Sequence, residues 1–543
     1  MPLPTNGQSS KRPNIVMTPL FERVLAQDED ASRIQQQYAD LQAATEQLRA
    51  KCGLFREKPP SNNSPASNLK RKASDHPLDG LESIEENEPT AGDLLARLSN
   101  ELRDELSNVT PNETIHLCGF GPLQALASRP FEVWELAREK LHTWPYSRVP
   151  VCWRRLLEDA TLAKVARMLI LRAVAVEGLT SKRRMISASE RQNATTSPDR
   201  WFADVVRELD VGMSMSGTPG RRSTFEHAFR KLEKLLPQDA VPQVASNFGI
   251  ERPNKIQLGS PTAHENEPLT FEAFQSHLDH KTTPLIIPGA LEHWPASTEW
   301  QNPNYFLGRT LGGHRVVPIE LGKMYTDAEW SQRLMPFHEF LTNYLLPANP
   351  DEIGYLAQHD LFSQIPSLRS DFSIPDYCYT TPPPPTGAVS HTSGLGTTPQ
   401  LDEPQLNVWF GPKGTKTPLH TDPYHNILCQ VVGYKFVLLF PPSDTGKLYP
   451  RGENENGVSM ANTSQLDVSS MCPRELLFRS GSSSPTDSVT GARCDLFERF
   501  PAFAGTDHLE AILGPGESLY VPLGWWHYVE SLTTSISVSF WWN

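Results

Sequence analysis

The sequence is poor in cysteine. Its 543 residues include only 7 cysteines, which are odd in number, widely scattered and without a C-x-x-C pair. Neither a disulfide framework nor a cysteine-based zinc module is therefore indicated. We expect a reduced, intracellular protein located in the nucleus, the cytoplasm or both.

The sequence also lacks long apolar runs and an excess of positive charge. The N-terminus, MPLPTNGQSSKRPN, has no apolar core of the kind that a secretory signal requires. The longest apolar run, 165–176, is interrupted by Arg167 and Arg172 and is too short to span a bilayer. The formal net charge of −13 argues against broad binding to a phosphate backbone. We expect no membrane role and no direct nucleic-acid partner, whereas a basic protein substrate fits this charge.

Residues 1–90 are rich in Ser, Asn, Pro and charged residues. Such a composition buries too little apolar area to offset chain entropy, so this region is predicted to be largely disordered. Within it, heptad-like apolar spacing predicts a short helix at 30–51, which either pairs with a partner or is merely solvated. The basic run Lys70–Lys72 is compatible with a nuclear import signal and equally with chance.

Residues 91–245 show helical periodicity instead. Apolar residues recur at three or four positions in the stretches 94–106, 131–141 and 153–176. This pattern predicts an all-α domain. Such a domain more often mediates protein contacts than chemistry, so we expect it to be a helical interaction domain that binds a protein partner.

After a predicted linker at 246–265, residues 266–543 break into short strands separated by Gly and Pro. The segments that show this are LIIPG, LNVWFGP, ILCQVVGYKFVLLFPP, SLYVPLGWWHYV and SISVSFWW. Alternating strands of this kind predict a β-sandwich or barrel, and the whole chain is predicted to be an α+β multidomain protein. Polar stretches near 380–400 and 479–493 are expected to be insertions in surface loops.

A metal site is indicated by His420-Thr421-Asp422 after one strand and by His527 at the start of another, more than a hundred positions later. In a strand, residues i and i+2 point to the same face, so His420 and Asp422 can share one ion. A distant histidine completes the set. Two imidazoles and one carboxylate form the facial triad of non-haem Fe(II) oxygenases.

The His-x-Asp triplet alone is weak evidence, because about one is expected by chance among 16 histidines. The triplet His277–Asp279 has the same form, but it lies in the helical-looking FEAFQSHLDH, where residues i and i+2 diverge by about 200°. His508–Glu510 fits only loosely. An isolated histidine is usually a solvated or hydrogen-bonded side chain. The sequence around His420 and His527 is therefore needed to identify them as metal ligands.

That neighbourhood resembles the jumonji-C oxygenases. The resemblance is carried by HTDPYHN, VVGYKF, GPGESLYVPLGWWHYV and SVSFWW, and it extends through VPIELGKMYTDAEWSQ, EIGYLAQHDLFSQIPSL, SIPDYC and WFGPKGTKTPLH over roughly 266–543. It is greatest with the members described as arginyl hydroxylases and lysine demethylases. The resemblance implies a double-stranded β-helix, a cupin-like jelly roll, that binds Fe(II) through His420, Asp422 and His527, with 2-oxoglutarate and O2 as cosubstrates.

The cosubstrate 2-oxoglutarate is a dianion whose far carboxylate must be neutralised in a closed pocket. Lys435 follows His420 on a strand with apolar neighbours and is a cation at a suitable position, although an exposed strand lysine is the alternative. The resemblance implies that Lys435, Thr417 and Tyr355 bind this carboxylate, with Asn426 near the iron-chelating end.

A guanidinium group is best recognised by a carboxylate beside aromatic rings. The resemblance implies that Glu320, Tyr325 and Trp409 take this role, although Trp409 also fits a core aromatic. The implied reaction is hydroxylation of an arginyl side chain in a protein. N-methyl-lysine demethylation and histone-tail peptidase activity remain alternatives, as does a non-catalytic scaffold that acts through the helical domain. The presence of all three metal ligands and the lysine disfavours the scaffold.

Overall fold

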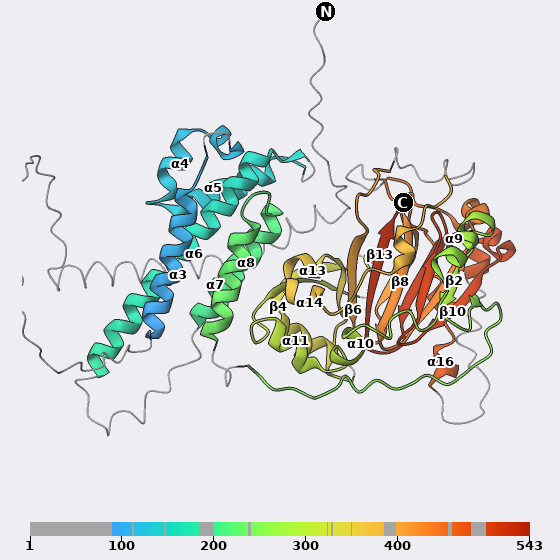
Figure 1. Ribbon diagram of the computed structural model, residues 1–543. Coiled ribbons are helices and arrows are strands. Elements are labelled where there is room, and N and C mark those ends of the chain that lie inside the picture. Colours follow the sequence, from blue (N-terminus) through green and yellow to red (C-terminus); the bar gives the residue numbers. More distant parts are fainter. Residues whose placement is uncertain are drawn as a thin grey trace, which may run out of the picture.

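The computed structural model describes residues 89–110, 113–145, 148–183, 200–236, 241–322, 324–326, 329–348, 350–384, 398–453, 459–478 and 496–543. The predictions made for 30–51 and Lys70–Lys72 lie outside these residues. So do the insertion predicted at 479–493 and most of the one at 380–400. The described chain has a helical region and a β-rich region that lie side by side (Figure 1).

The helical region contains the elements α3 (Ala91–Ser107), η1 (Thr114–Cys118), α4 (Phe120–Leu126), α5 (Pro130–His142), α6 (Val151–Arg183), α7 (Arg200–Ser216) and α8 (Arg222–Leu235). Helix α3 starts at a capping box, in which the Thr90 hydroxyl accepts from the Asp93 N–H and the Asp93 carboxylate accepts from the Thr90 N–H. Helices α3, α5 and α7 pack against the long helix α6. The helical periodicity of the sequence therefore corresponds to a helical bundle.

The β-rich region is built from two sheets. Among the described strands, one sheet has nine in the order β1-β2-β11-β8-β13-β6-β5-β3-β4, and the other has four in the order β10-β9-β12-β7. The strands are β1 (Ala263–His264), β2 (Leu285–Ile287), β3 (Val316–Leu321), β4 (Ser331–Pro336), β5 (Gly354–His359), β6 (Gln405–Gly411), β7 (Lys416–Thr421), β8 (His425–Val432), β9 (Lys435–Phe440), β10 (Leu509–Leu513), β11 (Ser518–Val521), β12 (Trp526–Ser531) and β13 (Ser535–Trp542).

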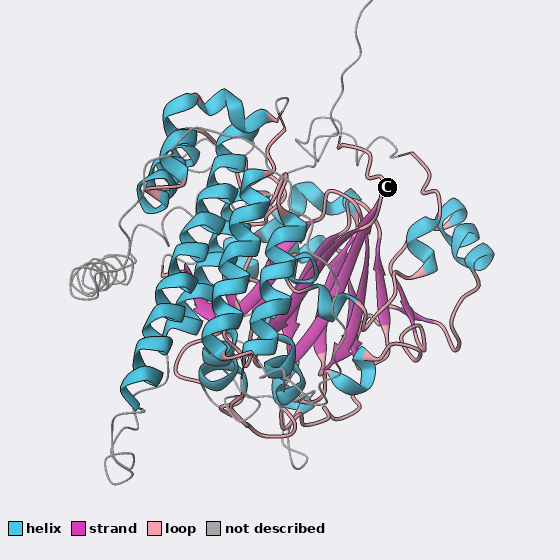
Figure 2. Cartoon of the chain, turned by 60° about the vertical axis from the view of Figure 1, so that its left-hand side comes forward, coloured by secondary structure: helices cyan, strands magenta, loops and turns pink. Residues whose placement is uncertain are grey.

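Alternating side chains of these strands form two apolar layers. The layer between the sheets is made by Ile286, Leu428, Val437, Leu439, Ala511, Leu513, Leu519 and Val521. The other face of the large sheet packs under helices that include α9 (Phe271–His280), α11 (Pro303–Arg309) and α12 (Phe337–Phe340). Strands β8 and β13 of the large sheet are consequently buried at every position. Strand β9 of the small sheet is also buried at every position, because the outer face of that sheet packs against segments that include 442–448 and 501–505. Figure 2 shows helices around the strands. The predicted double-stranded β-helix with flanking helices is confirmed.

The predicted linker 246–265 follows the surface of the β-rich region. Phe248 belongs to the apolar core beneath the large sheet, and β1 pairs in parallel with β2. Part of the predicted linker therefore packs against the β-rich region. Within the described part of the chain, no helix is long and apolar enough to cross a membrane, and the cysteines of that part are free.

Candidate metal centre

Strands β7 and β12 bring two histidines together. The strands pair antiparallel with His420 directly opposite His527, and the two imidazole centroids lie 4.2 Å apart. The register shifts just beyond this pair, between His527 and Val529. Pro418 of β7 lies at this irregularity, where its missing N–H costs the ladder least. Bulges of this kind commonly aim side chains at a site.

The carboxylate of Asp422 faces both imidazoles from the position just after β7. Its oxygens lie 3.5 Å from His420 Nε2 and 3.5 Å from His527 Nε2. The other ring nitrogens are held by carbonyl oxygens, His420 Nδ1 by Pro418 at 2.8 Å and His527 Nδ1 by Trp525 at 3.2 Å. With Nδ1 donating, both Nε2 lone pairs point to the carboxylate, which is the arrangement that a shared divalent ion requires.

The protonation states also fit a metal. Burial, together with the nearby His420 ring, lowers the pKa of His527 to about 4, so this imidazole is neutral at physiological pH. Burial acts to raise the pKa of Asp422, but His527 and His420 outweigh it and the pKa is lowered. The three groups have ligand atoms within 4.8 Å of one another and are the sole such cluster among the described residues. A neutral imidazole and an ionised carboxylate are suitable ligands for a divalent cation.

Asn426, on β8, connects the metal ligands to the cavity beside them. Its amide nitrogen donates to Asp422 Oδ2 at 2.8 Å, which orients the carboxylate. Its amide oxygen is buried and has no hydrogen-bond partner in the described part of the chain. A buried unpaired acceptor of this kind favours a bound group that supplies a donor.

A cavity contains this centre. Its lining joins the predicted residues His420, Asp422, His527, Lys435, Thr417, Tyr355, Asn426 and Trp409 to the apolar residues Leu428, Val437, Leu519, Val521 and Val529. The sequence reasoning missed the apolar walls. Alternation within the strands was visible, but strands that are buried on both faces do not show which side chains point inward.

Lys435 lies at the start of β9 and is 1% exposed. Its ammonium lies 5.9 Å from the centroid of the Tyr355 ring and has no acid or carbonyl partner in the described part of the chain. Burial lowers its pKa to about 7. An unpaired buried cation is costly unless an anion accompanies it, so this side chain is no ordinary strand lysine.

Thr417 and Tyr355 line the same cavity as this ammonium. Thr417 is buried on β7 and Tyr355 is buried on β5, and their side chains interact through a hydrogen bond. Burial raises the pKa of Tyr355, so its phenol stays a neutral donor. Two hydroxyls and one ammonium thus line the cavity that also contains His420 and His527, and together they can bind a carboxylate.

Of the three predicted substrate residues, only Trp409 lines the cavity. Its indole N–H donates to Ser539 Oγ at 2.9 Å. Glu320 lies outside the lining, opposite Tyr355 across β3 and β5, and accepts from Trp330 Nε1 at 3.2 Å. Burial raises the pKa of Glu320 to about 7. A partly desolvated carboxylate at this place fits a cationic ligand.

Tyr325 also lies outside the lining of the cavity. It lies near both Glu320 and the metal ligand Asp422, since the charges of both raise its pKa. Its hydroxyl is hydrogen-bonded to Thr463 at 3.2 Å, and Thr463 pairs through its backbone with His420. Burial raises the pKa of Tyr325 to about 12, and the charges of Glu320 and Asp422 add to this increase. Sequence spacing gave no signal for Trp330 and Thr463, because each reaches the site through a loop.

The competing histidine motifs lie elsewhere. His277 is in helix α9, and its Nε2 is hydrogen-bonded to the Thr283 carbonyl at 2.8 Å. His508 contacts Glu510 at 3.6 Å, without a third ligand within reach in the described residues. The helical reading of the first motif is confirmed.

Comparison with known proteins agrees with this geometry. A family model described as a cupin-like domain matches residues 271–543, which is half of the chain. The Drosophila melanogaster protein named Jumonji C domain-containing protein 5 is 31% identical over 472 residues, which cover 85% of this chain and 96% of that protein. The chain belongs to the jumonji-C oxygenases.

Two further relatives within the jumonji-C family support this assignment. Lysine-specific demethylase 8 of Xenopus tropicalis is 40% identical over 274 residues, which cover 50% of this chain and 51% of that protein. Lysine-specific demethylase JMJ30 of Arabidopsis thaliana is 39% identical over 370 residues, which cover 63% of this chain and 75% of that protein. The match to the Xenopus protein thus spans only about half of that protein's length.

Proposed function

We propose that this jumonji-C protein is an Fe(II)- and 2-oxoglutarate-dependent oxygenase that hydroxylates arginyl side chains of a protein. The observation that supports the cosubstrate is the unpaired ammonium of Lys435 in the cavity that holds His420, Asp422 and His527. One carboxylate, one ammonium, a divalent metal and a dicarboxylate sum to zero charge. A neutral sum is what a buried site requires.

Each group of the chain then has a defined task. His420, Asp422 and His527 would hold Fe(II), and Asn426 would keep the carboxylate oriented through its amide. Lys435, with the Thr417 and Tyr355 hydroxyls, would bind the far carboxylate of 2-oxoglutarate. The iron, with O2 and 2-oxoglutarate, supplies the oxidation that inserts one oxygen atom into a substrate C–H bond. The apolar walls exclude water from this reaction.

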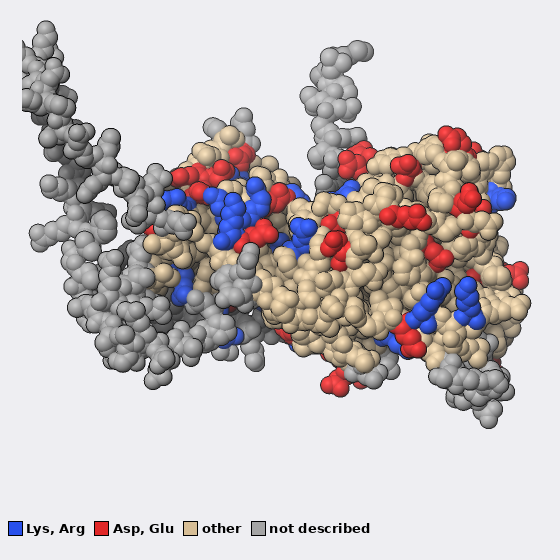
Figure 3. Space-filling view, turned by 60° about the horizontal axis from the view of Figure 1, so that its bottom comes forward, with Lys and Arg blue, Asp and Glu red and all other residues tan. Residues whose placement is uncertain are grey.

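Arginine is favoured as the target because of Glu320. Its carboxylate accepts a hydrogen bond from Trp330 on one oxygen, and Tyr325 lies close enough for the charge of Glu320 to affect its pKa. Trp409 lines the cavity. A planar guanidinium can use a carboxylate and aromatic faces together. On the face shown in Figure 3, acidic side chains are spread over the β-rich region, which suits a basic substrate.

N-methyl-lysine demethylation is the second candidate. The Xenopus and Arabidopsis relatives are named lysine-specific demethylases, and the same oxidation on an N-methyl group would release it as formaldehyde. A carboxylate also attracts a methylammonium, but that cation cannot donate two parallel hydrogen bonds. The chemistry of Glu320 therefore ranks arginine above methyl-lysine.

The test uses matched peptides that carry arginine, lysine or methylated lysine at one position. The full-length protein is incubated with Fe(II), 2-oxoglutarate and each peptide, and product masses are read. A gain of one oxygen on the arginine peptide is expected. Loss of a methyl group, with arginine unchanged, would instead establish the demethylase, and peptide cleavage would point to a peptidase.

The variant Glu320→Gln separates substrate binding from the oxidation itself. It keeps the shape of the side chain and removes its charge, so we expect a higher KM for the arginine peptide with 2-oxoglutarate still bound. Unchanged hydroxylation by this variant would contradict the role of Glu320.

A further inference from the structure

The helical region meets the β-rich region through one buried carboxylate. Asp210 of α7 is 1% exposed and accepts hydrogen bonds from three residues of the other region. Arg315 donates through Nη2 at 2.7 Å and through Nε at 3.0 Å, Val316 donates its backbone N–H at 2.7 Å, and Gln364 donates Nε2 at 2.8 Å. A carboxylate so fully occupied fixes all three partners.

Further contacts join the helical region to the β-rich region, and together with the Asp210 cluster they form the junction between the two regions. The guanidinium of Arg315 lies 3.6 Å from the centroid of the Phe229 ring of α8. Val211 of α7 and Val316 of β3 belong to one buried apolar cluster. Arg222 of α8 donates to the Ser363 carbonyl. The helical region is thus packed onto the start of β3 and onto α13 (Leu361–Gln364).

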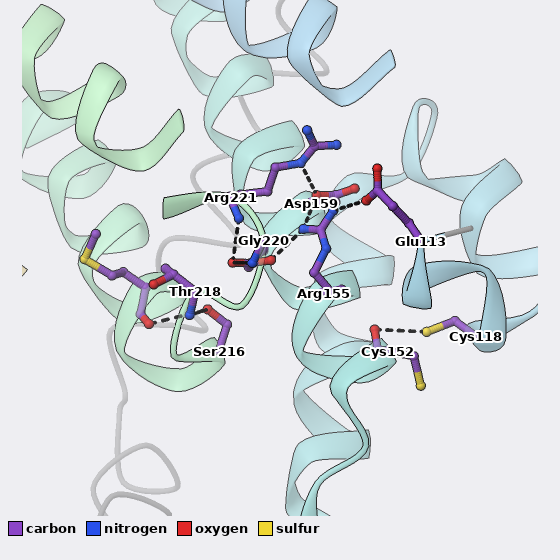
Figure 4. A network of polar contacts seen from close by, with 11 residues as sticks. Glu113, Cys118, Cys152, Arg155, Asp159, Ser216, Thr218, Gly220 and Arg221 are labelled. Atoms are coloured by element: carbon purple, nitrogen blue, oxygen red, sulfur yellow. Dashed lines mark hydrogen bonds and ion pairs between the residues drawn. The ribbon is translucent and has the colours of Figure 1, made fainter. Parts of the chain in front are cut away.

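Helix α7 is itself held firmly within the bundle. In Figure 4, the turn that joins α7 to α8 lies against helix α6. Glu158 accepts from the backbone N–H groups of Gly220 and Arg221 at 3.1 and 3.0 Å, and Asp159 accepts from Arg221 Nε at 3.0 Å. Arg155 binds both of these acids. Asp210 therefore lies on a helix whose position is fixed by these contacts with α6.

The junction replaces sheet pairing that β3 and β5 lack. The two strands pair only at one end, where Glu320 faces Tyr355 and Leu321 faces Gly354. At the other end they are bridged by Gln364, which donates to the Val316 carbonyl at 2.7 Å and is hydrogen-bonded to His359 at 2.7 Å. The same Gln364 amide donates to Asp210.

Strand β5 needs such support. Its pairing with β6 shifts register between Leu356 and His359, and Gln358 has a φ of 48°, a left-handed conformation that is unfavourable outside glycine. The links from His359 through Gln364 to Asp210 hold the end of this strand. Tyr355, which faces the cosubstrate pocket, lies four residues before His359 on the same strand, roughly 13 Å away in an extended chain.

We propose that Asp210 is a positioning residue for the active site, which it serves by fixing the open ends of β3 and β5 and thereby the places of Glu320 and Tyr355. This inference rests on the proposed function of those two residues. The helical region is on this view a structural part of the oxygenase, whatever partner it binds.

The experiment compares Asp210→Asn with Glu208→Gln. Glu208 lies two residues earlier on α7, is also buried, and pairs at 2.8 Å with Lys164 inside the helical region. Both variants remove one buried charge from one helix with little change of shape. Only the first removes a charge that contacts the β-rich region, so the pair controls for general destabilisation.

Two measurements are made on the full-length chain. Hydrogen exchange of the β3 and β5 amides should become faster in Asp210→Asn and stay unchanged in Glu208→Gln. The KM for the arginine peptide should rise roughly tenfold in Asp210→Asn, with kcat changed less than about twofold. A purely structural role would instead lower the active fraction, and so kcat, with KM constant.

The proposal is overturned if Asp210→Asn keeps the exchange rates and the peptide KM of the parent protein, or if Glu208→Gln changes both equally. Should Asp210→Asn fail to fold, Gln364→Met leaves the Asp210–Arg315 pair in place and must give the same rise in KM. If the parent protein does not hydroxylate arginine, the proposed function fails, and the exchange measurement still decides whether Asp210 fixes β3 and β5.

Discussion

His420 and His527 are directly opposite each other across β7 and β12, with imidazole centroids 4.2 Å apart. Because Asp422 completes the cluster, loss of one imidazole leaves two ligands for the ion. We expect His420→Ala to weaken binding of Fe(II) or Mn(II) by roughly a hundredfold or more, measured by titration calorimetry. His508→Ala is the matched control, since His508 also lies near a carboxylate but outside the cavity. Equal metal affinity of His420→Ala and the parent protein would remove the basis of the assignment.

Replacement of Lys435 should increase the stability of the protein and weaken cosubstrate binding. Its buried ammonium has no partner in the described chain, so Lys435→Met should raise the free energy of unfolding of the cosubstrate-free protein by about 2 kcal/mol. The same variant should bind 2-oxoglutarate roughly a hundredfold more weakly. Denaturant titration and calorimetry measure the two effects. A variant that is destabilised and still binds the cosubstrate would contradict the role of Lys435.

Cosubstrate binding should depend on pH through Lys435. Burial lowers its pKa to about 7, whereas an exposed lysine has a pKa of 10.5, so in the free protein the ammonium is present below about pH 7 and is lost above it. A dianion binds the protonated form, so the affinity for 2-oxoglutarate should fall as pH rises above 7, by at most about tenfold per pH unit. Binding at pH 8 should take up a proton, which calorimetry in buffers of different ionisation enthalpy detects. No pH dependence between 6 and 9 would refute this account.

Substrate binding should have the opposite pH dependence. Burial raises the pKa of Glu320 to about 7, so its carboxylate is protonated below that pH and charged above it. The KM for an arginine peptide should therefore rise as pH falls below 7, at saturating 2-oxoglutarate. In Glu320→Gln this acid limb should disappear. An acid limb that persists in the variant would assign the titration to another group.

The turn between β8 and β9 fixes the place of Lys435. Gly433 has a φ of 75°, and an added Cβ would lie 2.0 Å from the Thr534 carbonyl oxygen. We expect Gly433→Ala to cost roughly 3 kcal/mol of unfolding free energy. Gly516 has a φ of 90° with open space around it, so Gly516→Ala should cost only about 1 kcal/mol. The costs are measured by denaturant titration. Equal costs would show that the positive φ, and not the clash with Thr534, determines the loss of stability.

Local patterns in the sequence predicted much of the fold. The segments around LNVWFGP, ILCQVVGYKFVLLFPP and SISVSFWW became β6, β8, β9 and β13, because apolar runs bounded by Gly and Pro have few other stable forms. The pairing of His420 with His527 was expected from residue type and context. The exact partners of each ligand, such as the Pro418 carbonyl, depend on register and had no local signal.

Contacts between distant segments could not be predicted. Asp210 and Arg315 are far apart in the sequence, and each alone reads as a surface charge. Trp330 and Thr463 reach Glu320 and Tyr325 through loops whose path no periodicity describes. The packing of Phe248, within the predicted linker, is another contact of this kind. The predictions for residues 1–88, including the import signal, stay predictions.

The register of β7 and β12 links metal binding to folding. A slip of one residue in this pair would turn His527 to the opposite face of the sheet, where it could no longer meet His420 and Asp422. The ion can therefore be captured only after the last strands of the chain have joined the barrel correctly. Iron supply should then influence the yield of native protein during synthesis. An ion that binds only the correctly folded chain stabilises that state relative to misfolded ones.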